Sequence, residues 1–255
     1  MRLTNRTVLV TGGSAGIGLA FALKFLELGN TVIVTGRRQS VLDEVKARHP
    51  GLHTIQSDIA DPAQIAALAA RVKAEFPKLD VLMNNAGVGQ ARNLAVPASD
   101  LAALTAEIDI NLNGPIRMTS ALIDLLTVNR GTVINVSSAL AFVPLPSNPI
   151  YCATKAAVHS YTQSLRFQLA DAGVEVIELM PPAVRTDLTG DFAEHGVAMI
   201  TTDALVSESF AKLRAGASEI RPGQSNQLAF MRRLAPGFIN RQLWKASKAM
   251  VPAAA

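Results

Sequence analysis

Hydrophobic positions along the chain alternate between two periodicities. Short runs rich in Val, Ile and Leu are followed by longer segments whose apolar residues recur at helical spacing. The short runs predict strands at 7–11, 31–35, 52–56, 79–83, 131–136 and 174–179. The longer segments predict helices at 17–28, 40–48, 62–76, about 99–126 and 150–170. Strands that alternate with helices in this way are typical of a parallel sheet covered on both faces.

Several of the predicted strands are apolar on both faces, as in Val32-Ile33-Val34. Such strands are buried from two sides, which favours an α/β fold with a doubly wound parallel sheet. There is neither an internal repeat nor a linker that would separate a second unit, so we expect residues 1–255 to form one domain. The alternation of strands and helices breaks at about 186–202, which we expect to be a substrate lid. Residues from about 224 to 255 form a C-terminal tail.

The composition excludes several classes of protein. Hydrophobic residues make up 49% of the chain and charged residues 17%, as in globular proteins. No apolar run approaches the roughly 18 residues of a membrane span, and residues 1–6 contain no apolar signal core, so we expect a cytoplasmic protein. The one cysteine, Cys152, excludes an intrachain disulfide, and the four histidines lack the spacing of a metal site.

The positive charge is concentrated at the C-terminus. The formal net charge is +4, and residues 221–255 hold six basic side chains and no acidic one, which leaves −2 for residues 1–220. The body of the chain therefore has no basic excess, and we expect no binding to nucleic acid. The tail also carries Phe230, Phe238 and Trp244. It could lie on an anionic membrane, but Pro236-Gly237 interrupts any long helix, so we favour packing within the protein or against a second subunit.

A glycine-rich turn, Thr11-Gly-Gly-Ser-Ala-Gly-Ile-Gly18, follows the first predicted strand and opens the first predicted helix. Glycines allow a tight turn and the close approach of a pyrophosphate, and the helix N-terminus supplies free N–H groups and a positive dipole end. In this context we predict a dinucleotide-binding turn. Its expected contacts to the cofactor come from Gly12, Ser14, Gly16, Ile17 and Gly18.

The end of the second predicted strand indicates which dinucleotide binds. An NAD site usually has a carboxylate there that accepts a hydrogen bond from the ribose 2′-hydroxyl. Here the strand runs into Arg37 and Arg38, whose guanidinium groups suit a phosphate. We therefore predict NADP(H), with NAD(H) still possible. The alternative is a pair of solvated arginines, which the positive end of a helix dipole disfavours.

Three residues further along point to proton transfer at an oxygen atom. Tyr151 and Lys155 stand four apart on a predicted helix and so share a face, while Ser138 follows the predicted strand 131–136. A free tyrosine has a pKa of about 10, and a nearby ammonium group lowers it. We therefore predict that Tyr151 is an acid or base tuned by Lys155. Ser138, at the carboxyl edge where α/β sheets bind ligands, would hold the substrate oxygen.

Together these motifs resemble those of the short-chain dehydrogenase/reductase family. The resemblance covers about residues 5–190 and is carried by 11–18, Asp58, 84–87, Asn111, 137–138, 151–155, 181–182 and Thr186. It implies a Rossmann-like doubly wound parallel sheet of about seven strands with helices on both faces. It also implies a homodimer or homotetramer in which the helices near 100–127 and 150–170 pack against their counterparts.

The same resemblance implies a role for each matching residue. Asn111 would hold a water, and Ser138 would position a carbonyl. Tyr151 would be the acid or base, while Lys155 would also bind the nicotinamide ribose. Beyond the glycine turn, the implied cofactor contacts are Arg37, Arg38, Asp58 (at the adenine), Asn85, Ala86, Gly87, Tyr151, Lys155, Pro181, Val184 and Thr186 (at the carboxamide).

Two positions depart from the family pattern. Pro182 stands where a glycine is usual, which stiffens the loop that would hold the carboxamide, and Ala15 stands where many NADP-using members have a basic residue. Neither departure removes a residue of the predicted catalytic group.

We therefore predict an NADP(H)-dependent oxidoreductase of the carbonyl reductase or alcohol dehydrogenase type, with a small-molecule carbonyl or alcohol as substrate. An epimerase or dehydratase is disfavoured because such relatives usually carry a longer C-terminal region. A different class is a catalytically decayed NADP(H)-sensing protein, which the intact catalytic positions disfavour. Cys152 and His159 lie beside the predicted site, and we expect both to serve packing.

Overall fold

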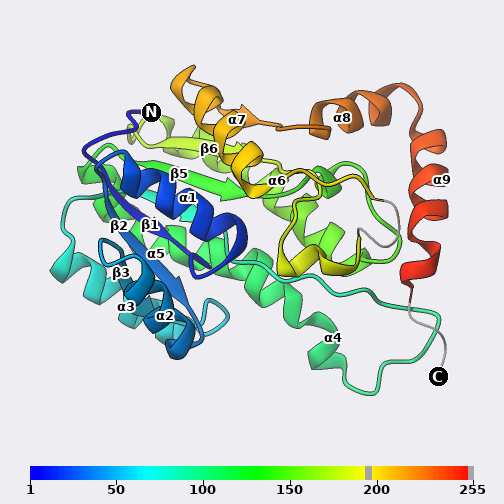
Figure 1. The fold of residues 1–255 in the computed structure, drawn as a ribbon, viewed down its shortest axis with the longest axis horizontal. Helices are drawn as coiled ribbons and strands as arrows, with labels where there is room; N and C mark the ends of the chain where they lie inside the picture. The colour runs from blue at the N-terminus through cyan, green and yellow to red at the C-terminus, as the bar shows by residue number, and fades with distance from the viewer. Residues whose placement is uncertain (193–196, 252–255) are drawn as a thin grey trace.

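A parallel sheet of seven strands runs through the centre of the protein in a computed structural model that describes residues 1–192 and 197–251 (Figure 1). The strand order is β3-β2-β1-β4-β5-β6-β7. The strands are β1 (Thr7–Val10), β2 (Thr31–Gly36), β3 (His53–Gln56), β4 (Leu79–Asn84), β5 (Thr132–Val136), β6 (Glu175–Leu179) and β7 (Glu219–Ile220). The predicted doubly wound sheet is confirmed, since β1 has β2 on one side and β4 on the other.

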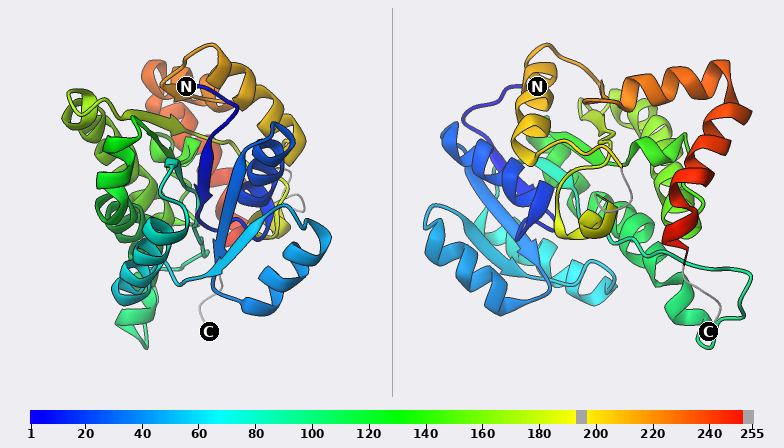
Figure 2. Two further views of the ribbon diagram at one scale, coloured as in Figure 1. Left: turned by 90° about the vertical axis from the view of Figure 1, so that its left-hand side faces the viewer. Right: turned by 45° about the vertical axis from the view of Figure 1, so that its right-hand side comes forward.

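Helices cover both faces of this sheet. The α-helices are α1 (Gly16–Glu27), α2 (Gln39–Arg48), α3 (Pro62–Glu75), α4 (Leu101–Ile108), α5 (Gly114–Val128), α6 (Pro149–Ala170), α7 (Thr202–Arg214), α8 (Ser225–Leu234) and α9 (Pro236–Ser247). Shorter helical turns are the π-helical η1 (Asp109–Asn113) and the 3₁₀ turns η2 (Ala139–Ala141), η3 (Asp187–Phe192) and η4 (Lys248–Met250). Views from two further directions show the layers edge-on (Figure 2).

Each central strand feeds two separate cores, because its successive side chains point to opposite faces. Val8 and Val10 pack with α1, α2 and α7, while Leu9 between them packs with α3, α5 and α6. All three side chains are fully buried. The apolar character of the predicted strands therefore reflects burial on both sides, as expected.

The long helix predicted at about 99–126 is instead three segments. Between α4 and α5 lies η1, where the Gly114 N–H donates to the Asp109 carbonyl, five residues back. Pro115 has no N–H to donate to the residue four before it, which removes one bond of a regular α-helix at this point. Gly114 also lies against Ile59, since a Cβ there would be 2.7 Å from that side chain. Gly114 and Pro115 therefore widen the helix at η1 rather than end it.

The C-terminal tail forms two helices that project from the sheet. Figures 1 and 2 show α8 and α9 at the rim of the molecule, with a sharp bend between them at Pro236. We call residues 225–247 the C-terminal arm. The arm is held to the body where Arg232 Nε donates to the Phe142 carbonyl at 3.1 Å. Within the described residues, no helix combines the length and apolar character that a membrane span needs.

Candidate active site

An open cleft lies at the carboxyl edge of the sheet, between β1 and β4, where the order of the strands reverses. Its walls come from the glycine turn, the end of β2, the segments after β4 and β5, the start of α6 and residues 181–189. Ligands of doubly wound sheets bind where the strand order reverses, because the helices that follow β1 and β4 lie on opposite faces of the sheet. Residues far apart in the sequence thus face one cleft.

The glycine turn is shaped by close contacts that only glycine allows. Gly12 has a φ of +63°, and a Cβ there would be 2.8 Å from the Ala86 Cα. A Cβ on Gly18 would be 2.3 Å from the Gly12 carbonyl oxygen. Gly18 therefore lies behind the cleft wall and packs the helix start under the turn, whereas Gly12, Ser14, Gly16 and Ile17 line the cleft.

The loop after β4 is bound directly to this turn. The Asn85 side-chain amide donates to the carbonyls of Thr11 and Gly12 at 3.0 and 3.1 Å. The Thr11 hydroxyl accepts from the backbone N–H groups of Asn85 and Ala86 at 3.0 and 3.1 Å. Asn85, Ala86 and Gly87 all line the cleft, so these bonds hold two of its walls together.

Arg37 and Arg38 lie on the cleft at the end of β2, next to the glycine turn. Both side chains are exposed, and no carboxylate of the described residues lies within ion-pair distance of either. A Cβ on Gly36 would approach the Ser14 hydroxyl to 3.0 Å, which shows how near the end of β2 lies to the turn. Two uncompensated guanidinium groups are thus available to an anionic ligand in the cleft.

The predicted catalytic residues meet at the other end of the cleft. Tyr151 and Lys155 lie in the first half of α6, and Ser138 follows β5. The Tyr151 hydroxyl hydrogen-bonds to Ser138. Lys155 Nζ donates to the Val136 carbonyl at 2.9 Å and lies 5.6 Å from the centre of the Tyr151 ring. The Leu140 N–H donates to Ser138 Oγ at 3.1 Å and so fixes its rotamer.

Burial controls the protonation of this group in the protein alone. Desolvation raises the pKa of Tyr151 to about 12, against the opposing effect of the hydrogen bond from Ser138. Desolvation also lowers the pKa of Lys155 to about 8. The expected lowering of the Tyr151 pKa is therefore wrong for the protein by itself, because desolvation is the largest influence on that pKa and raises it. At neutral pH the Tyr151 phenol is protonated and can donate.

Asn111 sits in η1, behind the cleft wall. Its side-chain amide donates to the Val88 carbonyl at 2.8 Å and to the Thr154 hydroxyl at 3.1 Å, and its carbonyl oxygen accepts from the Val88 N–H at 2.9 Å. A Cβ on Gly87 would lie 3.3 Å from Asn111 Oδ1 and 3.5 Å from Lys155 Nζ. Asn111 thus ties the loop after β4 to α6, beside Lys155.

The remaining predicted residues divide into two groups. Pro181, Val184 and Thr186 line the cleft. Asp58 does not, although its neighbours Ser57 and Ile59 do. The Asp58 carboxylate accepts from the Ala60 N–H at 2.9 Å, within its own turn. The structure therefore brings most of the predicted residues to one cleft, while Gly18, Asp58 and Asn111 lie outside its lining.

The predicted lid at 186–202 begins on the cleft. Asp187, Leu188 and Thr189 line it, and the segment returns to the body where Ile200 pairs with Val184. Residues 193–196 of the predicted lid lie outside the described part of the chain.

Sequence reasoning missed several cleft residues because they bring no distinctive chemistry. Ile59, Val88 and Ile110 are apolar lining residues adjacent to recognised motifs, and that adjacency was the available signal. Glu178 was missed as well. It is a fully buried carboxylate in β6 that bonds Ser137, and its signal was an acidic residue inside an apolar strand. Cys152 is buried and accepts from the Leu145 N–H, and burial raises the pKa of its thiol to about 11, which fits the expected packing role.

Comparisons with known proteins agree on one family. The family model described as short chain dehydrogenase matches residues 6–196. The chain is 45% identical over 189 residues to the uncharacterized oxidoreductase DltE of Bacillus subtilis (strain 168), covering 74% of this chain and 75% of that protein.

Two solved structures have the same fold. A short chain dehydrogenase from Burkholderia cenocepacia J2315 in complex with NADP superimposes with a TM-score of 0.83 at 28% identity, covering 95% and 99% of the two chains. A 3-ketoacyl-(acyl-carrier-protein) reductase from Brucella melitensis complexed with NADH gives a TM-score of 0.75 at 27% identity, covering 83% and 91%.

Proposed function

Because the chain belongs to the short-chain dehydrogenase family and is therefore an oxidoreductase, we propose that it is an NADP(H)-dependent carbonyl reductase or alcohol dehydrogenase. The observation that carries the proposal is the convergence of Ser138, Tyr151 and Lys155 at one end of a cleft whose other end is the glycine turn. A dinucleotide that extends along the cleft would bring its nicotinamide to the proton donor.

The chain offers distinct groups for each part of the cofactor. The N–H groups at the start of α1, with the turn at Gly12–Gly18, would hold the pyrophosphate. Arg37 or Arg38 would bind the 2′-phosphate, as their uncompensated charges support. Thr186 would meet the carboxamide, and Asp58 would meet the adenine only through a small shift of its turn. The bound cofactor would supply the hydride.

Proton transfer is then the work of the protein. In the reducing direction Tyr151 donates its phenolic proton to the substrate carbonyl oxygen as the hydride reaches the carbonyl carbon. Ser138, already bonded to Tyr151, orients that oxygen. The Lys155 ammonium group stabilises the phenolate left on Tyr151, because the two groups share one face of α6. Asn111 positions the start of η1 against α6 and holds a water next to Lys155.

We further propose that residues 1–255 act as one domain within a homodimer or homotetramer. Two large side chains on the outer helices support this assembly, since Val128 at the end of α5 and Phe167 on α6 are more than four-fifths exposed. Both side chains belong to the helices that are expected to pack against their counterparts in a second subunit.

A panel of ketones, aldehydes and secondary alcohols, assayed with NADPH or NADP⁺ and again with NADH or NAD⁺, tests the proposal. We expect turnover with at least one pair and a lower KM for the phosphorylated cofactor. Tight cofactor binding without turnover of any compound would favour the NADP(H)-sensing protein. A lower KM for NADH would contradict the role given to Arg37 and Arg38.

A further inference from the structure

A buried carboxylate lies directly behind the catalytic end of the cleft. Glu178 in β6 is 0% exposed, and its Oε1 accepts a hydrogen bond from the Ser137 hydroxyl at 2.5 Å. Ser137 itself lines the cleft beside Ser138 and Val136. The negative charge of Glu178 is therefore separated from the cleft by one side chain.

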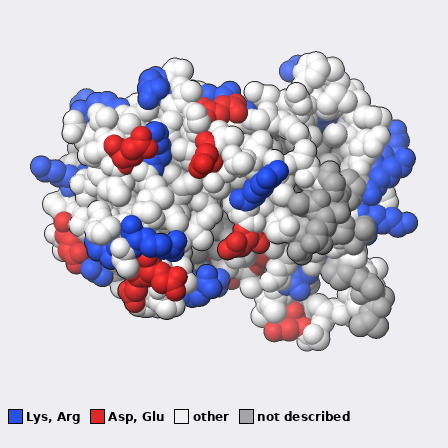
Figure 3. Space-filling model, viewed as in Figure 1, with Lys and Arg blue, Asp and Glu red and all other residues white. Residues whose placement is uncertain are grey.

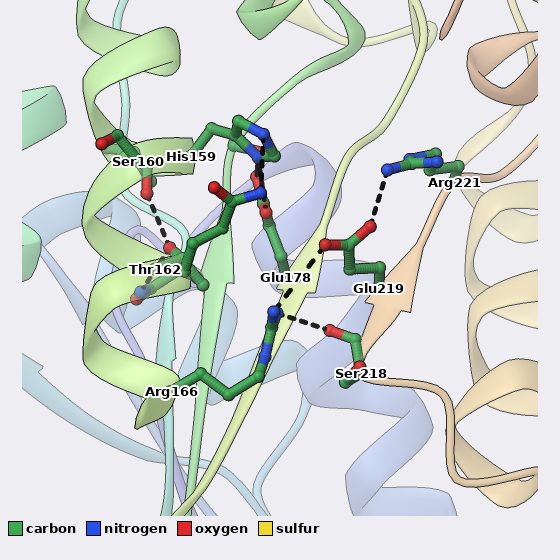
Figure 4. Close-up of polar contacts among 12 residues, drawn as sticks. His159, Ser160, Thr162, Arg166, Glu178, Ser218, Glu219 and Arg221 are labelled. Atoms are coloured by element: carbon green, nitrogen blue, oxygen red, sulfur yellow. Dashed lines mark hydrogen bonds and ion pairs between the residues drawn. The ribbon is translucent and has the colours of Figure 1, made fainter. Parts of the chain in front are cut away.

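His159 is the cationic partner of this carboxylate. Its Nδ1 lies 3.0 and 2.8 Å from the two oxygens of Glu178, and its Nε2 lies 3.2 Å from the Gln163 amide (Figure 4). A carboxylate only accepts, so Nδ1 carries a hydrogen in either charge state of the ring. The His159 side chain is 25% exposed, so its ring can exchange a proton with solvent.

The other charged groups around His159 are already paired with one another. Glu219 in β7 binds Arg221 at 2.6 Å and Arg166 of α6 at 3.7 Å (Figure 4). Arg166 also donates to the carbonyls of Val176 and Ser218. In the described part of the chain, His159 is thus the one residue that forms an ion pair with Glu178. Whether the pair is neutral or carries a charge of −1 depends on a single proton on His159.

This arrangement has a consequence for a ligand that changes its own charge. The oxidised nicotinamide ring is a cation and the reduced ring is neutral. A buried negative charge stabilises the cation and leaves the neutral ring nearly unaffected, and low-dielectric surroundings strengthen the effect. We propose that Glu178 sets the preference of the cleft for oxidised over reduced cofactor, and that His159 switches this preference with pH. The inference rests on the proposed function.

The direction of the switch follows from the pair. The hydrogen bond with Glu178 is the largest influence on His159 and raises its pKa, with a smaller contribution of the same sign from Glu219 and opposition from burial and Arg221. Below that pKa the imidazolium neutralises Glu178. Above it, the unbalanced carboxylate favours the oxidised ring, so the Kd of NADP⁺ falls relative to that of NADPH as pH rises.

The test measures both dissociation constants by fluorescence titration from about pH 6 to about pH 9 and takes their ratio. The ratio cancels contributions common to both cofactor forms, including those of the 2′-phosphate. Lys155 titrates in the same range, so the decisive comparison is between proteins. We expect Glu178→Gln to favour NADPH by about three- to tenfold over wild type at the upper end of the range.

Replacing His159 instead of Glu178 should shift the ratio of the two dissociation constants in the opposite direction. His159→Gln keeps a hydrogen-bond donor for Glu178 but removes the cation, so near pH 7 it should favour NADP⁺ relative to wild type. Glu219→Gln makes the same chemical change on the neighbouring strand β7, where Glu219 pairs in register with Glu178, and should leave the ratio within about twofold of wild type. A purely structural role of the pair would instead move both dissociation constants in the same direction.

Equal ratios in wild type and Glu178→Gln across the whole range would overturn the inference while leaving the proposed function intact. Failure of both cofactors to bind wild type would instead remove the proposed function. If the variants do not fold, an NMR titration of His159 in the wild-type protein decides. By linkage its pKa should be lower in the NADP⁺ complex than in the NADPH complex, and equal values would overturn the inference.

Discussion

The cleft and the C-terminal arm differ in which kind of side chain they bury. In the cleft, polar groups such as Ser138 and Lys155 are buried, and each bonds a defined partner: Ser138 accepts from the Leu140 N–H and Lys155 donates to the Val136 carbonyl. In the arm, Phe230, Leu234 and Phe238 are large apolar residues that remain exposed. The cleft is therefore built within one chain, whereas the arm keeps large apolar side chains exposed.

Charge follows the same division. Basic side chains are interspersed with acidic ones over the sheet domain, but basic side chains alone gather at the edge where α9 lies (Figure 3). The exposed basic residues of this region are Arg232, Arg233, Arg241, Lys245 and Lys248. The cleft gathers buried polar groups and the arm gathers exposed apolar and basic ones, so substitutions in the two regions should have separable effects.

The largest effect is expected at Tyr151. Tyr151→Phe removes the phenolic proton and should lower kcat by about 10²–10⁴-fold, while the Kd of the cofactor stays near wild type. The matched control is Tyr161→Phe, on the same helix and one of the two tyrosines of the chain, which should keep most of the activity. Near-normal kcat in Tyr151→Phe would mean that the cleft does not use this acid.

A smaller effect is expected at the far end of the cleft. Replacing both Arg37 and Arg38 with Ala removes the charge-assisted bond to a 2′-phosphate, which is worth about 1.5–3 kcal/mol, or about 10- to 100-fold in KM. The KM for NADPH should rise by this factor while that for NADH hardly changes. Arg48→Ala, at the last turn of α2, is the control and should affect neither. An equal loss for both cofactors would show that the arginines act on the fold.

The arm should change assembly more than chemistry. A double variant, Phe238→Ser with Trp244→Ser, should weaken self-association by about 10-fold or more, because exposed aromatic residues are frequent interface anchors. Light scattering at micromolar concentration should show a mass closer to the 27.0 kDa of the monomer, with kcat near wild type. Unchanged assembly in buffer combined with lost binding to anionic vesicles would assign the arm to a membrane surface instead.

The smallest effect concerns stability and pH. Because Glu178 raises the pKa of His159, their pairing stabilises the fold fully below the unfolded pKa of about 6.5 and loses this effect as pH rises through the folded value. The melting temperature of wild type should exceed that of His159→Gln by a few degrees at about pH 6, and by less at about pH 9. The burial of Lys155 acts in the opposite direction, but it is common to both proteins. A difference that grows with pH would contradict the pairing.

Sequence patterns predicted the helices and strands whose apolar residues recur with a regular period. Strands β1 to β6 and helices α1, α2, α3 and α6 lie within two residues of their expected bounds, because apolar periodicity and burial on two faces agree there, whereas β7 was not predicted. The cleft residues with distinctive chemistry, such as Tyr151 and Arg37, also lie where the motifs predicted. These are properties that a short segment carries by itself.

The rest depends on contacts that no local pattern encodes. The protonation of Tyr151 follows from how deeply it is buried, and burial is a property of the whole fold. The pairing of Glu178 with His159 joins a strand to a helix 19 residues earlier in the chain. The sequence did not predict the two helices of the arm, whose large apolar residues Phe230, Leu234, Phe238 and Trp244 stay exposed in the fold.

The π-helical turn η1 makes one segment of the protein intolerant of length changes. It contains one residue more than an α-helical turn would need, and Asn111 reaches Val88 and Thr154 from within it. Deleting a residue between Ile108 and Gly114 would replace the wide turn with regular α-helical winding and change the direction in which the remaining side chains of the turn face. A single-residue deletion in this stretch would therefore separate Asn111 from Val88 and Thr154.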